Sequence, residues 1–169
     1  MTQAMSGLKG MLENITAFAD TVKAASAEEA ADAAAQAEAM VGAAALVETA
    51  YLVASADGSF SAAEHEKLAR AVSGATGGLV DEGTAQALVD GAAERKSAEG
   101  QDARIHELGG MLGERNLQRA ALLMACGIAW LDRGVGTKEG LVLQALARAF
   151  GMEIHEMHKI LAEAKQAVS

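Results

Sequence analysis

The sequence contains no proline, whereas it contains eighteen glycines among its 169 residues. Proline is the strongest helix breaker, so without it glycine has to end the helices by taking left-handed positions at their C-termini. Hydrophobic residues make up 51% of the chain and are mainly alanine, which has the highest intrinsic helix propensity. The sequence therefore predicts an all-α fold whose helices approach closely through small side chains.

Hydrophobic periodicity and capping residues divide the chain into seven or eight helices joined by short loops, a size that fits a single domain. The expected helices cover residues 8–22, 26–56, 61–74, 82–98, 102–114, 117–131, 137–150 and 152 onward. The helix over 26–56 either continues through Gly42 or is interrupted near it, and Asn116 and Thr137 are expected to cap the helices that follow them. The amphipathic helix over 8–22 either packs on its own domain or binds a partner, a membrane surface or a second copy of the chain.

Two of these helices end in the same kind of acidic turn. In A-Y-L-V-A-S-A-D-G-S-F-S-A-A-E the carboxylates Asp57 and Glu64 are seven residues apart, and in A-C-G-I-A-W-L-D-R-G-V-G-T-K-E the same spacing separates Asp132 and Glu139. We interpret the repeat as an internal duplication of a helical hairpin. Such a duplication can bring the two acidic corners together within one bundle, which makes them the candidate site.

Two interpretations of these carboxylates fit the sequence. In the structural one, aspartate before glycine is ordinary turn chemistry, and Glu64 forms a capping box with Ser61 three residues earlier. Glu139 lies only two residues after Thr137 and forms no such box, although the helix dipole still favours it. In the other interpretation, Asp57, Glu64, Asp132 and Glu139 bind calcium or magnesium, which prefer several oxygen ligands.

Charge and cysteine content restrict the partners and the compartment. A formal charge of -9 argues against nucleic acid, whose affinity depends on lysine and arginine, and favours cations or basic proteins. The single cysteine, Cys126, cannot form an intramolecular disulfide, which is consistent with a reducing cytoplasm. The apolar run from Ala120 to Leu131 is too short to cross a bilayer, so no direct membrane insertion is expected.

The sequence offers little support for catalysis. No nucleophile with an adjacent base can be assembled from spacing, and Cys126 lies in an apolar helix where a thiol is unreactive. His155 and His158 are three residues apart and could share a zinc ion, but two histidines without a third firm ligand are more typical of a solvated helix face. We therefore expect a protein that is not an enzyme. The alternatives are an oligomeric scaffold without metal and a metal-dependent enzyme.

The segment V-A-S-A-D-G-S-F-S-A-A-E-H-E-K-L, with the later A-L-A-R-A-F-G-M, resembles the tellurite-resistance TerB-like family. The resemblance places a TerB-like helical domain over residues 41–169 and leaves 1–40 outside it. It implies a cytoplasmic module linked to stress response, with acidic corners that bind metal, protein partners in membrane-associated complexes and no known reaction. His65 replaces a glutamate common in the family, and Arg133 is expected to pair with Asp132 and reduce its affinity for cations.

Overall fold

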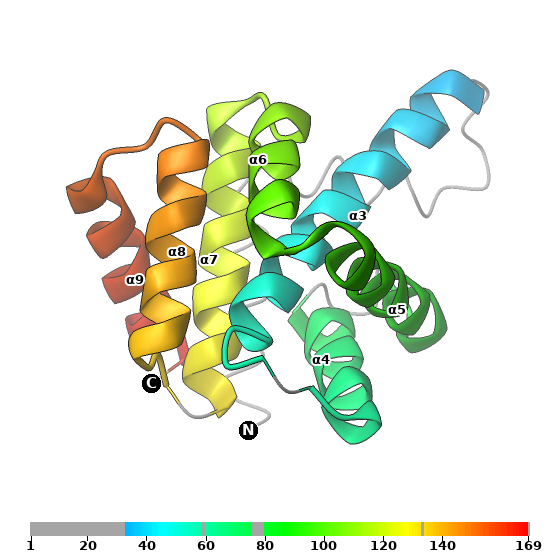
Figure 1. Cartoon of the computed structure of the whole chain (residues 1–169), viewed down its shortest axis with the longest axis horizontal. Helices are drawn as coiled ribbons and strands as arrows, with labels where there is room; N and C mark the ends of the chain where they lie inside the picture. Colours follow the sequence, from blue (N-terminus) through cyan, green and yellow to red (C-terminus); the bar gives the residue numbers. More distant parts are fainter. Residues whose placement is uncertain (1–32, 59, 76–79, 133, 169) are drawn as a thin grey trace.

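The structure is a computed structural model that describes residues 33–58, 60–75, 80–132 and 134–168. Within these ranges it contains helices and connecting loops and no strand, which confirms the all-α prediction (Figure 1). The seven helices are α3 (Ala33–Ala54), α4 (Ala62–Ala75), α5 (Glu82–Glu99), α6 (Gln101–Met111), α7 (Arg115–Asp132), α8 (Thr137–Ala149) and α9 (Ile154–Val168). The helix expected over 8–22 and the start of the one expected from residue 26 lie outside the described residues.

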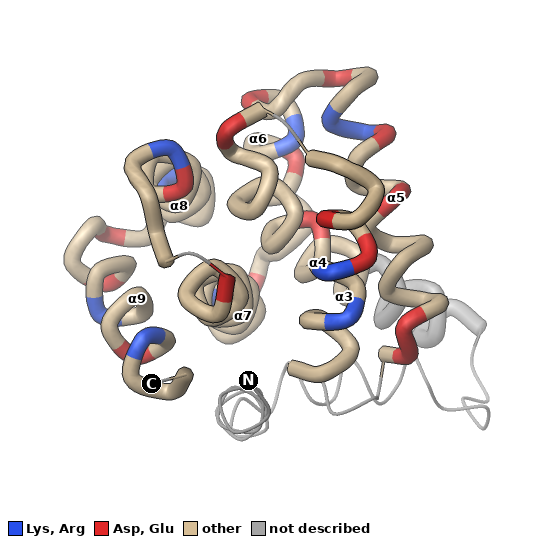
Figure 2. Tube along the Cα trace, turned by 90° about the horizontal axis from the view of Figure 1, so that it is seen from below, with Lys and Arg blue, Asp and Glu red and all other residues tan. Residues whose placement is uncertain are grey.

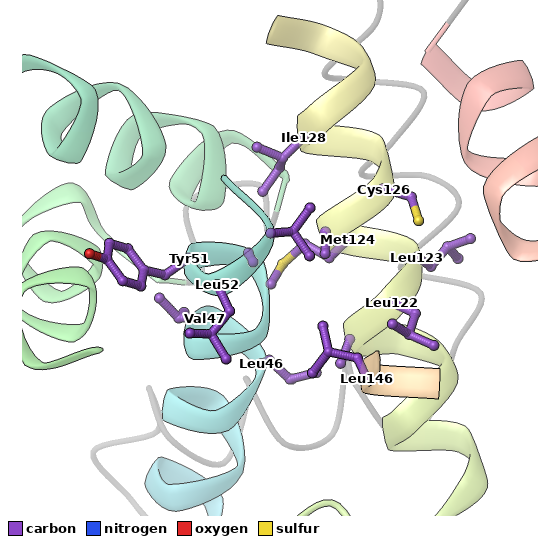
Figure 3. Packing of buried hydrophobic residues seen from close by; sticks show 14 of the residues in the cluster. Leu46, Val47, Tyr51, Leu52, Leu122, Leu123, Met124, Cys126, Ile128 and Leu146 are labelled. Carbon is purple, nitrogen blue, oxygen red and sulfur yellow. The ribbon is translucent and has the colours of Figure 1, made fainter. Parts of the chain in front are cut away.

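Helices α3 and α7 form the centre of the bundle and pack against each other. Every residue of α7 from Ala120 to Ile128 is buried, as expected for the most apolar segment. Figure 3 shows why: Met124 and Ile128 point toward α3, while Leu123 and Cys126 point to the opposite side, where α9 covers the helix. Because both sides of α7 are covered, its apolar residues are not restricted to one stripe.

The two halves of the chain share an order of elements. In each half a central helix, α3 or α7, is followed by an acidic corner and a second helix, α4 or α8. A third helix then packs against the central one: α5 packs on α3, and α9 packs on α7. The two corners also turn alike, because Gly58 and Gly134 both take positive φ angles, of 90° and 85°. The halves differ in detail: α4 packs mainly on α5, whereas α8 also contacts α3 and α6.

Two predicted helix boundaries around α6 and α7 were wrong. Helix α6 ends at Met111 instead of Glu114, because the buried Gln118 side chain donates to the Leu112 carbonyl at 2.6 Å and fixes the chain there. Helix α7 begins at Arg115, and its first turn is closed by the Gln118 N–H bonding to the Glu114 carbonyl at 3.0 Å. Asn116 consequently lies inside the helix and is not its cap.

The structure also decides whether α3 is interrupted and corrects one predicted cap. Helix α3 continues through Gly42 without a break, since one glycine within a long alanine-rich segment costs only about 1 kcal/mol relative to alanine. Thr137 is the first residue of α8, and the cap position belongs to Gly136, which makes no side-chain capping bond. Ser61, in contrast, occupies the capping position before α4 that was predicted for it.

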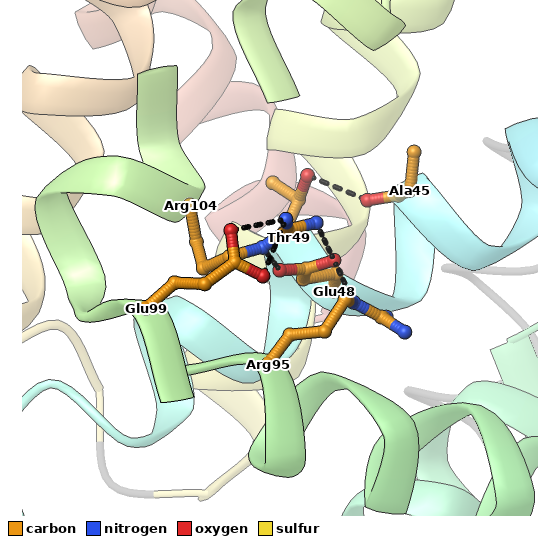
Figure 4. A network of polar contacts seen from close by, with 6 residues as sticks. All are labelled: Ala45, Glu48, Thr49, Arg95, Glu99 and Arg104. Carbon is orange, nitrogen blue, oxygen red and sulfur yellow. Dashed lines mark hydrogen bonds and ion pairs between the residues drawn. The ribbon is translucent and has the colours of Figure 1, made fainter. Parts of the chain in front are cut away.

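A buried ionic network joins α3, α5 and α6 (Figure 4). The carboxylate of Glu48, 1% exposed, accepts hydrogen bonds from Arg104 at 2.7 and 3.0 Å and from Arg95 at 3.0 Å. Glu99 accepts from the same Arg104 guanidinium at 3.3 Å. The hydrogen bonds to Glu48 raise the pKa of Arg104, although burial of the guanidinium opposes this. The network fixes α5 and α6 relative to α3 and so positions the helical hairpin that carries α4.

Candidate binding site at the two acidic corners

A pocket of about 330 Å³ lies where α4 passes the C-terminal end of α7 and the start of α8. We call it the corner pocket, because residues following both central helices line it. Its wall is mostly apolar and is formed by Ala54, Phe60, Leu68, Ala71, Ile128, Ala129 and Leu131. Residues of both corners therefore share one pocket: Phe60 and Glu64 follow the first acidic turn, and Gly134 and Glu139 belong to the second.

Three of the four predicted carboxylates line the corner pocket: Glu64, Asp132 and Glu139. Lys67 and Arg70 of α4 line it as well, so its charged residues are of both signs. Figure 2 views the molecule from this end and shows acidic and basic positions together on α4, α7 and α8. The fourth predicted residue, Asp57, is not among the lining residues.

Glu64 is held by the capping box that the sequence predicted. Its Oε1 accepts from the Ser61 N–H and from the Ser61 hydroxyl, both at 3.2 Å, and the Glu64 N–H bonds to Ser61 Oγ at 3.2 Å. The reciprocal bonds satisfy backbone groups that would otherwise lack partners at the start of α4. One carboxylate oxygen of Glu64 therefore already has a structural role.

Asp132 forms an ion pair with Lys67, across the contact between α7 and α4. Both side chains are about half exposed, at 41% and 55%, so the pair contributes little to stability. Arg133, the partner expected from the sequence, lies outside the described residues. Local sequence could not reveal Lys67, because it lies 65 residues before Asp132 and on another helix.

Glu139 lies in the first turn of α8 and folds back over the start of that helix. Its Oε2 is 2.7 Å from the point that a Cβ on Gly136 would occupy, so a larger residue at this cap position would require the Glu139 carboxylate to move. The helix dipole favours a negative charge there. Within the described chain Glu139 forms no ion pair or side-chain hydrogen bond, and it is half-buried at the edge of the pocket.

Asp57 has a different environment from Asp132. It is exposed, and its charge acts on Lys96 of α5, whose ammonium donates to the Ser55 carbonyl and hydroxyl at 3.0 Å. Burial lowers the pKa of Lys96, and the negative charge of Asp57 partly offsets that effect. The two aspartates that match in the sequence thus lie next to different helices, Asp57 beside α5 and Asp132 beside α4.

The carboxylates at the corners do not form a ready-made cation site. Among the described residues, no three acidic, histidine or cysteine side chains come close enough together to hold a metal ion. Calcium and magnesium require more oxygen ligands than one or two side chains supply. Coordination by Asp57, Glu64, Asp132 and Glu139 therefore stays a prediction, and it would require Asp132 to leave Lys67.

An aromatic cluster supports the wall of the corner pocket. Tyr51, Phe60 and His65 contact one another, with ring centroids 5.1 to 5.8 Å apart. His65 Nδ1 also lies 3.2 Å from Asp90 Oδ1 on α5. His65, noted in the sequence only as a departure from the family pattern, thus connects α4 to α3 and α5 and holds Phe60 in the pocket wall.

The other candidates from the sequence lie elsewhere. His155 pairs with Glu153 at 3.1 Å on the exposed side of α9, and His158 is exposed. Cys126 is fully buried, and burial raises the pKa of its thiol to about 12. None of the described helices combines the length and the apolar character that a membrane span requires.

The fold and the site define a class of protein: an all-helical domain of two related halves, in which an acidic corner follows each central helix. A family model described as "Tellurite resistance protein TerB" matches residues 41–162. The chain belongs to this TerB family, which confirms the resemblance seen in the sequence. Searches of curated proteins and of solved structures gave no match.

Proposed function

We propose that this chain is a non-enzymatic interaction module of the TerB family that binds a protein partner at the corner pocket. The family description suggests that it works in the response to tellurite or a related stress. We propose a cytoplasmic location and a partner that belongs to a membrane-associated complex, as the family resemblance implies. One observation carries the proposal: the two duplicated corners meet at a single concave surface with apolar walls and charged edges.

The chemistry of the pocket favours binding over catalysis. Its volume of about 330 Å³ is at the lower end of the range for ligand sites, about 300 to 1,000 Å³. Among the described residues that line it there is no serine, threonine, cysteine, histidine or tyrosine, so it offers no hydroxyl or thiol nucleophile. The apolar wall suits a hydrophobic side chain of the partner. The charged residues of the pocket can discriminate among the partner residues next to that side chain.

Site-specific photo-crosslinking in cells tests this proposal. A photoreactive amino acid at Ala71, in the pocket wall, is expected to give a defined protein adduct whose amount changes on exposure to tellurite. The same amino acid at Ala87, an exposed position on α5, is the matched control and should give none. Equal adducts at both positions, or none at Ala71, would contradict the proposal. An adduct with a second copy of the chain would support the oligomeric scaffold instead.

A divalent cation is the second candidate ligand, because three of the predicted carboxylates share the pocket. Calorimetry tests this candidate. Calcium and magnesium are titrated into three proteins: the wild type, Lys67→Met, and the double variant Asp132→Asn, Glu139→Gln. If a cation binds here, removing Lys67 should increase its affinity, since the competing ammonium is gone, and the double variant should bind none. The absence of heat in both the wild type and Lys67→Met would exclude the cation. Elemental analysis of protein purified without chelator tests the alternative of a metal-dependent enzyme, which requires bound transition metal.

A further inference from the structure

The wall of the corner pocket has apolar surface that the chain itself does not cover. Of its seven apolar residues, Leu68 and Ile128 are buried, whereas the other five, including Phe60 and Leu131, remain partly exposed. Partly exposed apolar side chains that gather in a concave place mark an interaction surface. A space of about 330 Å³ suits one or two side chains of a protein better than a large cofactor.

The charges around this wall favour a basic neighbour. Acidic residues outnumber basic ones by three to two among the lining residues, and Lys67 is already paired with Asp132. Among the described residues that line the pocket, Arg70 is the only basic one besides Lys67, so Glu64 and Glu139 outnumber it. The whole chain has a formal charge of -9, so the long-range field also attracts a basic partner.

Glu139 is the carboxylate best placed to receive that basic group. It lines the pocket, is half-buried, and has no ion pair within the part of the chain that the structure describes. Its position over Gly136 keeps it at the N-terminus of α8 while its charge remains available. Arginine suits such an acceptor especially well, because its planar guanidinium can bond both carboxylate oxygens.

We infer that the partner is a protein segment that inserts a bulky apolar side chain into the corner pocket and places an arginine or lysine beside it, against Glu139. The inference rests on the proposed function, because it names the chemistry of the partner at the same site. It predicts a recognition motif of two residue types in close proximity, one apolar and one basic.

Selection from a random peptide library on the full chain tests the inference, with counter-selection on Ala71→Phe, which fills the pocket. The expected sequences pair Leu, Ile, Met, Phe or Trp with Arg or Lys a few residues away. For the best peptide, Ala71→Phe should reduce affinity at least about tenfold, while Ala87→Phe, on the exposed side of α5, should leave it unchanged. Helical circular dichroism and thermal melting verify that each variant is folded.

Charge variants then separate this inference from the proposed function. Glu139→Gln should weaken the best peptide about three- to tenfold and reduce the salt dependence of its binding, whereas Glu107→Gln, on the exposed side of α6, should change neither. Some selected peptides will lose affinity for Ala71→Phe. If these peptides lack a basic residue, or bind Glu139→Gln as tightly as the wild type, the inference is wrong while the proposed function still stands. If no selected peptide loses affinity for Ala71→Phe, both the inference and the proposed function are wrong.

Two other occupants would also overturn the inference. A synthetic peptide of residues 6–25 that competes for the pocket more strongly than the selected sequences would assign the site to the chain's own N-terminal segment. Concentration-dependent dimerisation in analytical ultracentrifugation, abolished by Ala71→Phe and retained in Ala87→Phe, would assign it to a second copy. If the site accepts a partner segment with a basic and an apolar residue, we expect neither competition by the 6–25 peptide nor dimerisation through the pocket.

Discussion

Arg104 on α6 bonds both oxygens of the Glu48 carboxylate on α3, from Nε to Oε2 at 2.7 Å and from Nη2 to Oε1 at 3.0 Å. Both residues are almost completely buried, at 6% and 1% exposure. Two parallel bonds fix the direction of a guanidinium as well as its distance, so the pair sets how α6 lies against α3. Among the described residues, no buried side-chain nitrogen or oxygen lacks a hydrogen-bond partner, so the low-dielectric core tolerates these charges.

Removing only Arg104 should destabilise the protein strongly. In Arg104→Met the Glu48 carboxylate remains buried and keeps only the bond from Arg95, and the expected loss is about 3 to 5 kcal/mol in the free energy of unfolding. Urea denaturation monitored by circular dichroism measures this loss. The double variant Glu48→Leu, Arg104→Met should recover a large part of it, because no buried charge is left unpaired. A loss below about 1 kcal/mol in the single variant would contradict the role assigned to the pair.

Two adjacent glycines in α6 should respond in opposite ways to alanine. A Cβ on Gly109 would lie 2.6 Å from the Ala149 carbonyl oxygen of α8, so Gly109→Ala should force the helices apart and destabilise by about 1 to 3 kcal/mol. Nothing lies within 4 Å of a Cβ on Gly110, and Gly110→Ala should stabilise by up to about 1 kcal/mol. Thermal melting of both variants measures the contrast. Equal shifts in melting temperature would show that the close contact between α6 and α8 is not important.

The parts of this fold that depend on local physics could be predicted from the sequence. The helical class, the central position of α7 and the capping box at Ser61 follow from composition, periodicity and a spacing of three residues, and the structure confirms each. The end of α6 was predicted too late, because the Gln118 side chain, six residues after Leu112, bonds the Leu112 carbonyl, and no helix periodicity or capping rule indicates that bond. A shared site for both corners was predicted, but Asp57 lies outside the pocket. The pairing of Lys67 with Asp132 was not predicted, since only the packing of α4 on α7 brings them together.

The N-cap of α5 makes a pH-dependent contribution to stability. Asp81 accepts from the Thr84 N–H at 2.7 Å, and this bond lowers the pKa of Asp81 below its ordinary value of 3.8. A depressed pKa means that the stabilisation is present above the unfolded-state value and is lost as the pH falls through the folded-state value. The variant Asp81→Asn keeps a capping oxygen but does not titrate. We therefore expect the wild type to lose stability relative to Asp81→Asn below about pH 4.

Urea denaturation of both proteins between about pH 3 and pH 7 measures this difference. Above about pH 5 the difference in free energy of unfolding should be constant, because the carboxylate is ionised in both states. Asp90 also lies on α5 but is paired with His65 and Gln86 instead of capping a helix, so Asp90→Asn is a useful comparison. A pH-independent difference between wild type and Asp81→Asn would show that the cap does not depend on its charge.

The thiol of Cys126 should report the opening of the contact between α7 and α9. It is completely buried, it points to the α9 side of α7, and burial raises its pKa to about 12. A thiol reagent needs an exposed thiolate, so labelling of the native protein at neutral pH should be slow and should accelerate sharply in urea. Trp130, which donates to the Leu161 carbonyl at 3.2 Å, is part of the same contact. Trp130→Phe loses that bond and should increase the labelling rate several-fold, through an opening free energy lower by about 1 kcal/mol. Rapid labelling of the wild type without denaturant would contradict the tight packing of α9 on α7.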